Sequence, residues 1–346
     1  MSRISVSVFT RVALLLFVPG PAFGQAAIQE LLNNGPTSNR INIVFLSEGY
    51  RSSELSKYVN TDVYTMLNRL LTTQPFQEYS PYFNAYAISV ASNESGSDHP
   101  PQHIYHDTFF NSTFYSYGIE RLLTLQGNGY FRVDSLLQLL MPEYDLVIVI
   151  VNDPEYGGSG GSIAVTSINS QSPEVVVHET GHSFGHLGDE YGDATPGYSG
   201  AETPNTTAET RRGYVKWRTW IDESTPLPTP QTSTYASVVG LFEGATYEQY
   251  GWYRPKLNCK MRSLGVPFCE VCGEDLLLSS YDLLRPVESV SPTSPTISVS
   301  DPQSALLSVR PLAPLTHTLD LRWSDNGIAI PGAIQDSLLI FSRALG

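Results

Sequence analysis

The stretch VVVHETGHSFGHLGDEYGD, residues 175–193, constrains the fold of this chain more than any other feature. His178 and His182 are four residues apart, so on a helix their imidazole rings project from one face and can bind the same ion. The three valines before them indicate that this helix is buried against a sheet. The motif therefore predicts a half-buried helix that carries part of a zinc site.

Glu179 follows the first histidine, where its carboxylate can hold a water molecule at the metal and take its proton. The alternative is a set of polar residues on a helix surface without a metal. The chain has seven histidines in 346 residues, and a chance occurrence of the motif is on the order of one per cent. We therefore favour a catalytic zinc site with Glu179 as its general base.

A catalytic zinc site uses three protein ligands and keeps a fourth position for water, so one ligand must come from outside the pair. His186 lies eight residues beyond His178, where an unbroken helix carries it about one turn too far along to reach the same ion. Gly185 matches the glycine of the extended H-E-x-x-H-x-x-G-x-x-H pattern, in which the helix ends and the third ligand comes three residues later. That position is Gly188, which has no side chain, and Asp189 follows it directly.

A carboxylate can replace an imidazole as a ligand of zinc. Asp189 is therefore the predicted third ligand. Glu190 and the more distant Glu243 stay open as substitutes.

The N-terminus, MSRISVSVFTRVALLLFVPGPAFGQAA, has the organisation of a secretory signal peptide. Two arginines precede an apolar run, and helix-breaking Pro and Gly follow it. Small residues end the segment, which predicts cleavage after Gly24. The apolar run is too short for a stable membrane anchor, and no later segment approaches the required length. We expect a secreted or periplasmic protein from which residues 1–24 are removed.

The charge balance is acidic, with 20 Lys and Arg against 34 Asp and Glu, and no basic run interrupts it. Nucleic acid and anionic membrane surfaces are therefore poor candidates as partners.

Cys259, Cys269 and Cys272 are the three cysteines of the chain. Export favours a disulfide between two of them and leaves the third over. The alternative is a metal site, for which a Cys-x-x-Cys pair and one further cysteine need a fourth ligand of another residue type. A local disulfide is the favoured interpretation, and its pairing stays open.

Strands and helices alternate from about residue 40. Residues 41–50, 83–90 and 144–153 are predicted strands, and residues 51–73 and 117–126 are predicted helices. This order predicts an α/β (α+β) fold in which helices back a mixed, twisted sheet.

The C-terminal part has a different composition. Residues 287–302 are rich in Ser, Pro and Thr and predict a linker. Residues 303–346 alternate as short strands, with Asn326-Gly327 as a hairpin turn. They resemble part of a β-sandwich, which needs more residues than these, so this partial module is either truncated or packs on the main domain.

Four glycines, Gly157, Gly158, Gly160 and Gly161, lie shortly before the histidine motif. They could form a flexible connector. We favour a backbone that lies close to a ligand, because glycine lets the main chain approach without side chains and the motif follows at once.

The stretch HETGHSFGHLGDEY resembles the signature of the IgA peptidase family, number sixty-four among the metallopeptidase families, in which His-Glu-x-Gly-His runs into Leu-x-Asp-Glu-Tyr. Further similar stretches cover nearly all of residues 40–280 in order: INIVFLSEGY, SNESGSD, YDLVIVIVN, YGGSGG, GLFEGATYEQYGWYRP and CKMRSLGVPFCEVC. His186 departs from the small residue that we expect there, which affects local packing. The resemblance implies a metzincin-like zincin domain over residues 25–286, with an active-site helix.

The resemblance also implies roles for residues outside the helix. Met261 would belong to a turn beneath the metal and form an apolar floor for the histidines, although an ordinary core methionine is equally compatible. Residues 157–161 would border the cleft, where an edge strand can pair with an extended substrate. Tyr191, Tyr253 and Arg254 are candidates to bind the substrate or the developing oxyanion, but structural roles are the favoured interpretation for each.

Together these features predict a secreted zinc metalloendopeptidase that hydrolyses protein or peptide substrates with one zinc ion and Glu179 as general base. A secreted binding or adhesion protein with a structural or vestigial zinc site is the alternative, but a structural site needs no base. A zinc hydrolase of non-peptide amides is a third class, and a glycine-rich strand edge favours peptides over it.

Overall fold

The computed structural model describes residues 26–194, 199–300, 303–316 and 319–341. The signal peptide predicted for residues 1–24 lies outside these ranges. Within them, no helix combines the length and the apolar composition that crossing a bilayer requires. The chain divides into two compact units, and each is described by itself. Unit 1 holds residues 42–69 and 84–183 with the N-terminal segment, and unit 2 holds residues 34–41, 70–83 and 184–346.

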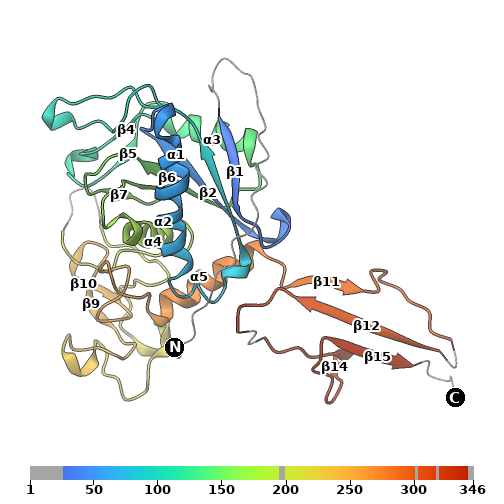
Figure 1. Cartoon of the computed structure of the whole chain (residues 1–346). Helices are drawn as coiled ribbons and strands as arrows, with labels where there is room; N and C mark the ends of the chain where they lie inside the picture. Colours follow the sequence, from blue (N-terminus) through green and yellow to red (C-terminus); the bar gives the residue numbers. More distant parts are fainter. Residues whose placement is uncertain (1–25, 195–198, 301–302, 317–318, 342–346) are drawn as a thin grey trace, which may run out of the picture. The chain divides into compact units, whose positions relative to one another are not determined.

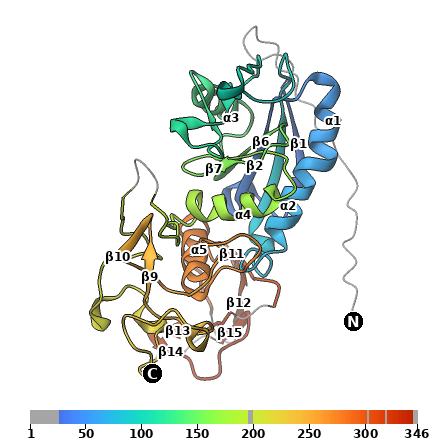
Figure 2. The same cartoon turned by 90° about the vertical axis from the view of Figure 1, so that its left-hand side faces the viewer.

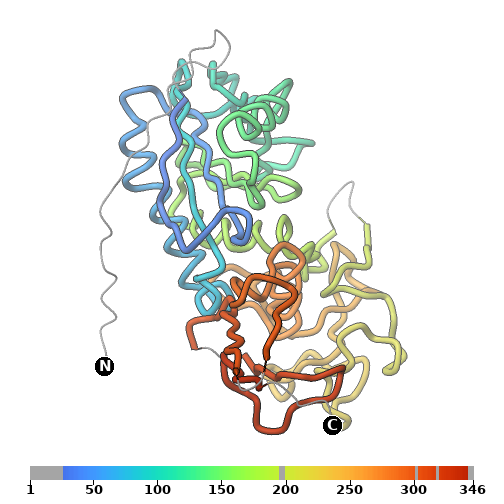
Figure 3. Tube along the Cα trace, turned by 90° about the vertical axis from the view of Figure 1, so that its right-hand side faces the viewer, coloured from blue at the N-terminus to red at the C-terminus, as the bar shows by residue number. Residues whose placement is uncertain are grey.

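A mixed six-stranded sheet forms the centre of unit 1, in the order β1-β3-β2-β6-β8-β7. The strands are β1 (Ala27–Leu32), β2 (Ile41–Glu48), β3 (Phe83–Ser89), β6 (Leu146–Val151), β7 (Gly158–Ser159) and β8 (Ala164–Thr166). β2 and β8 each pair with β6 in parallel, whereas β1 with β3 and β7 with β8 are antiparallel. Figure 3 shows β1 and β3 side by side in blue and cyan. The mixed sheet confirms the predicted fold class.

The central strands are buried on both faces, as their continuous apolar sequence predicts. Every residue of β2 and of β6 is buried. Residues 51–73 are helical as predicted, but in pieces: α1 (Leu55–Lys57), a π-helical stretch (Tyr58–Val63) and α2 (Tyr64–Leu71). Figure 1 shows these pieces as one rod along the sheet.

The helix predicted for residues 117–126 is wrong. Tyr115, Tyr117 and Gly118 have φ values of 59°, 54° and 78°, in a region that a right-handed helix excludes. Residues further on form the short strand β5 (Thr124–Leu125), which pairs with β4 (Ser112–Thr113). The helix lies later, as α3 (Gly129–Leu140), where Val133, Leu136 and Leu137 are fully buried at helical spacing.

Unit 2 contains the hairpin β9 (Phe242–Ala245) and β10 (Glu248–Arg254) and the helix α5 (Glu270–Leu283). A three-stranded antiparallel sheet follows, made of β11 (Val287–Ser291), β12 (Ser304–Pro311) and β15 (Ser337–Phe341). Short 3₁₀ helices span Thr37–Asn39, Ser52–Glu54, Ser80–Tyr82, Pro100–Gln102, Arg212–Tyr214, Arg218–Trp220 and Ser233–Tyr235 across the two units.

The C-terminal sheet includes residues that composition predicts as linker. β11 lies at the start of the 287–302 stretch and pairs with β12, so residues 287–291 form a strand and not part of a linker. Asn326 and Gly327 have φ values of 51° and 81° between β13 (Ser324–Asp325) and β14 (Ile328–Ala329), which is the predicted hairpin turn. The sheet is tied to the rest of unit 2, since Tyr82 donates a hydrogen bond to the Leu312 carbonyl at 2.9 Å.

One buried carboxylate organises a long loop of unit 1. Glu48, at the end of β2, is fully buried and accepts hydrogen bonds from the Thr108 hydroxyl at 2.6 Å and from the Phe110 and Ser112 amides at 2.7 and 2.8 Å. Burial raises the pKa of Glu48, and these three donors oppose that shift. The loop before β4 is thereby attached to the central sheet.

Replacing Glu48 by Ala is expected to lower the free energy of unfolding by about 3 kcal/mol, because buried amides lose their acceptor. Equilibrium unfolding in urea measures this loss. Glu155→Ala, at an exposed position, is the matched control and should change it by less than about 0.5 kcal/mol. Equal effects of the two substitutions would contradict the anchoring role.

Candidate functional site

The histidine motif lies on α4 (Ser172–Ser183) of unit 1. Pro173 and Glu174 occupy its first turn, where proline lacks only a redundant donor and an acid complements the helix dipole. Val175, Val176 and Val177 are buried, and α4 packs against β6, β7 and β8. The prediction of a helix buried against the sheet is therefore confirmed.

His178 and His182 face each other on the half-buried side of α4. Their Nε2 atoms are 3.2 Å apart, and the ring centroids are 4.8 Å apart in an edge-to-face arrangement. Two imidazole nitrogens that each lie about 2.0 to 2.1 Å from a tetrahedral zinc ion are about 3.3 Å apart. The pair thus has the separation that binding of a shared zinc ion requires.

Glu179 follows His178 on α4, and β7 of the glycine-rich segment packs against this helix (Figure 2). A Cβ added at Gly160 would lie 2.7 Å from Glu179 Oε2 and 2.9 Å from His182 Cβ. A Cβ added at Gly158 would lie 2.7 Å from a methyl carbon of Val175 and 3.7 Å from Glu179 Oε1. Glycine is required because the main chain approaches the motif so closely.

The four glycines differ in what they contact. Gly157 packs against the Phe114 ring, which a Cβ would approach to 2.5 Å. Both main-chain groups of Gly158 are engaged, since its amide donates to the Arg121 carbonyl and its carbonyl accepts from the Leu123 amide. Gly160 and Gly161 are exposed. Gly158 therefore already pairs with residues 121–123 through its main chain.

Replacing Gly160 by Ala is expected to lower the free energy of unfolding by about 1 to 3 kcal/mol, because the new methyl group overlaps the Cβ atom of His182. Urea unfolding measures the effect. Gly213→Ala, which meets no atom within 4 Å, is the control. A Gly160→Ala protein as stable as the control would show that the close approach is absent.

Asp189 lies in unit 2 and is 6% exposed. The Tyr247 hydroxyl donates to its Oδ2, and the Thr246 amide donates to its carbonyl at 2.9 Å. Burial and the neighbouring carboxylate raise the pKa of Tyr247, so the phenol keeps the proton that it donates. Tyr191 is next to Tyr247, with ring centroids 5.2 Å apart.

Tyr247 is a site residue that sequence reasoning did not identify. It lies 58 residues beyond Asp189, and neither motif nor periodicity connects the two positions. The only signal is its place within GLFEGATYEQYGWYRP, one of the stretches that resemble the family.

The other candidates for the third ligand have different surroundings. Glu190 is fully buried, and its Oε1 accepts from Asn205 Nδ2 at 2.9 Å and from Cys272 Sγ at 3.2 Å. Glu243, on β9, accepts the Gly251 amide at 2.9 Å. His186 is exposed and has a φ of 51°. This histidine therefore adopts the left-handed backbone conformation shortly after the end of α4.

Met261 lies in a tight turn and is fully buried. Its carbonyl accepts the Glu190 amide at 2.8 Å, which attaches the turn to the segment that follows Asp189. Arg254 is 1% exposed and donates to the Gln231 side chain at 3.0 Å and to two carbonyls of β9. The guanidinium is therefore engaged in the structure of the hairpin, where burial lowers its pKa to about 10.

Comparison with known families gives one match. The family model of IgA peptidase M64 matches residues 29–235 and 231–278, which include α4, Asp189, Tyr247 and the three cysteines. The match confirms the resemblance that the sequence motifs indicate. No curated protein sequence matches the chain.

Proposed function

Because this chain belongs to the IgA peptidase M64 family, which comprises metal-dependent peptidases, we propose that it is a secreted zinc endopeptidase. The facing Nε2 atoms of His178 and His182, 3.2 Å apart on α4 with Glu179 between them in sequence, carry the proposal. Peptidases of this family act on proteins or peptides. No residue of the site specifies immunoglobulin A, so the substrate class is protein or peptide in general.

Different residues of the chain would bind the metal and transfer the proton during hydrolysis. His178 and His182 would hold zinc, which when bound lowers the pKa of a water and polarises the scissile carbonyl. The Glu179 carboxylate accepts the proton of the attacking water as the new C–O bond forms, and delivers it to the amine as the C–N bond breaks. Gly160 leaves the space beside the Glu179 carboxylate free of a side chain.

Asp189 is the proposed third ligand. Ligating carboxylates are usually oriented by hydrogen bonds from neighbouring groups, and the Tyr247 hydroxyl supplies such a bond. Glu190 is directed toward cysteine sulfur, and Glu243 toward a hairpin amide. These contacts support Asp189 over both substitutes.

We also propose a metzincin-like arrangement of the site. Met261 is buried in a turn that bonds to Glu190, which supports its role as the methionine of a turn beneath the metal. Tyr191 packs against Tyr247 and is proposed to contact substrate. The segment after Gly158, including Gly160 and Gly161, is the proposed place for an extended peptide to pair.

Export is proposed from the signal peptide features of residues 1–24. A protein with this destination meets protein substrates outside the cytosol.

Glu179→Gln is expected to keep zinc and lower the rate of casein hydrolysis by about 10² to 10⁴-fold, because the ligands remain and the proton acceptor is lost. Zinc content and hydrolysis are measured in the same preparations, with and without a chelator. Glu155→Gln, at an exposed position, should leave both unchanged. Wild-type activity in Glu179→Gln would refute the base assignment, and zinc-loaded wild type that cleaves no protein or peptide would favour a binding protein.

Asp189→Asn is expected to weaken binding of the catalytic zinc by at least about tenfold, since the amide oxygen is a poorer ligand than a carboxylate. Activity measured against buffered free zinc reports the affinity of this ion alone. Glu243→Gln is the control and should match wild type. If Glu243→Gln shifts the zinc dependence and Asp189→Asn does not, Glu243 is the ligand.

A further inference from the structure

The three cysteines and Glu190 form a second group of potential metal ligands within unit 2. One ligand atom from each of the four side chains lies within 4.8 Å of all the others. Cys259, Cys272 and Glu190 are fully buried, and Cys269 is 6% exposed. All three cysteines are free thiols. The cluster thus contains the fourth ligand that the cysteine sequence pattern lacks.

The distances in the cluster fit a shared cation. Cys259 Sγ and Cys272 Sγ are 3.7 Å apart, and two thiolates that each lie about 2.3 Å from a tetrahedral zinc ion are about 3.8 Å apart. Cys272 Sγ is 3.2 Å from Glu190 Oε1, where the corresponding sulfur to oxygen separation is about 3.5 Å. A disulfide would bring two sulfur atoms to about 2.05 Å.

Local structure explains why these side chains converge. Cys269 is the residue before α5, and Cys272 lies in the first turn of that helix, so the Cys-x-x-Cys spacing directs both sulfurs to one side. Cys259 precedes the Met261 turn, and its sulfur accepts the Cys269 amide at 3.2 Å. Glu190 is attached to the same turn by its amide bond to the Met261 carbonyl.

Glu190 is an incompletely satisfied buried carboxylate. Its Oε2 has no hydrogen-bond partner among the residues that the structure describes, while Oε1 is shared by Asn205 and Cys272. A buried charged oxygen without a partner is costly. Arg254 is a nearby cation, but its guanidinium donates hydrogen bonds to Gln231 and to two β9 carbonyls. A cation at the cluster would satisfy the oxygen.

We propose that Cys259, Cys269, Cys272 and Glu190 bind a second zinc ion, which has a structural role. Three thiolates and one carboxylate complete a closed tetrahedral set, as structural sites require, with no position for water. The thiol protons leave to solvent as zinc binds. The ion would join the start of α5, the Met261 turn and the segment that carries Asp189.

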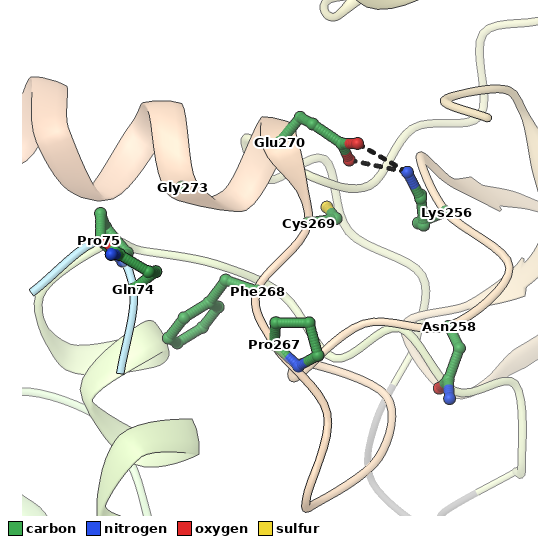
Figure 4. A pocket seen from close by; sticks show the side chains of 9 residues that line it. All are labelled: Gln74, Pro75, Lys256, Asn258, Pro267, Phe268, Cys269, Glu270 and Gly273. Carbon is green, nitrogen blue, oxygen red and sulfur yellow. Dashed lines mark hydrogen bonds and ion pairs between the residues drawn. The ribbon is translucent and has the colours of Figure 1, made fainter. Parts of the chain in front are cut away.

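A pocket lies next to the cluster. A pocket of about 380 Å³ is lined by nine residues of unit 2: Gln74, Pro75, Lys256, Asn258, Pro267, Phe268, Cys269, Glu270 and Gly273. Figure 4 shows Cys269 at the start of α5, beside the ion pair of Glu270 with Lys256. Cys269 is the member of the cluster that lines this pocket.

The competing chemistry is a disulfide. Oxidation of Cys259 and Cys272 would remove two thiol hydrogens, require an external oxidant and leave Cys269 and Glu190 facing the new bond. It would bind no cation. The two possibilities therefore differ in metal content, thiol count and mass.

The test counts metal per chain in the full protein with the catalytic pair removed. His178→Ala/His182→Ala purified with zinc is expected to hold one zinc, against two in wild type. After exchange with Co²⁺, this variant should show the thiolate-to-metal charge-transfer absorption that only cysteine ligands produce. All three thiols should react with a thiol reagent when the protein is denatured in the presence of a chelator. A metal-free variant, or an intact mass two hydrogens lower than the three-thiol chain, would overturn the proposal.

Two substitutions in the same background identify the fourth ligand. Glu190→Gln should weaken Co²⁺ binding by at least about tenfold. Glu270→Gln, which changes an exposed acid next to Cys269, should leave the spectrum and affinity unchanged. Equal affinities in these two variants would exclude Glu190 as a ligand. Because these readouts involve neither hydrolysis nor the histidines, they are independent of the proposed peptidase activity.

Discussion

The close approach of the glycine-rich segment to α4 is the contact on which the arrangement of the candidate site depends. A Cβ added at Gly160 would lie 2.7 Å from the Glu179 carboxylate and 2.9 Å from the Cβ atom of His182. The helix can lie this close to the edge of the sheet only because no side chain intervenes. Val175, Val176 and Val177 are buried one turn before the motif, and α4 packs on β7 and β8, so the sheet positions the helix that carries the motif.

Much of this arrangement follows from sequence, because it rests on local patterns. The apolar runs of β2 and β6 are fully buried strands, and the four-residue histidine spacing gives facing rings on a helix. Local patterns were misleading where backbone conformation decides the structure. Residues 117–126 have apolar residues at helical spacing, yet positive φ values at Tyr117 and Gly118 exclude a helix.

Contacts between distant residues could not be predicted from sequence. The bond from Tyr247 to Asp189 and the contact of Glu190 with Cys272 join positions 58 and 82 residues apart. The cysteine pattern alone left a disulfide and a metal site open, since no nearby residue supplied a fourth ligand. The fold brings Glu190 to the cysteines, so the two adjacent acids have different contacts. Asp189 accepts a hydrogen bond from the Tyr247 phenol, whereas Glu190 contacts the Cys272 thiol.

We propose that α4 holds a zinc ion through His178 and His182 together with Asp189. Anomalous diffraction at the zinc absorption edge, from crystals of the zinc-loaded protein, tests it most directly. We expect a peak within bonding distance of both Nε2 atoms and of an Asp189 oxygen, with the Glu179 carboxylate nearby but not bound. Zinc bound elsewhere, with no peak at the two histidines, would refute this zinc site.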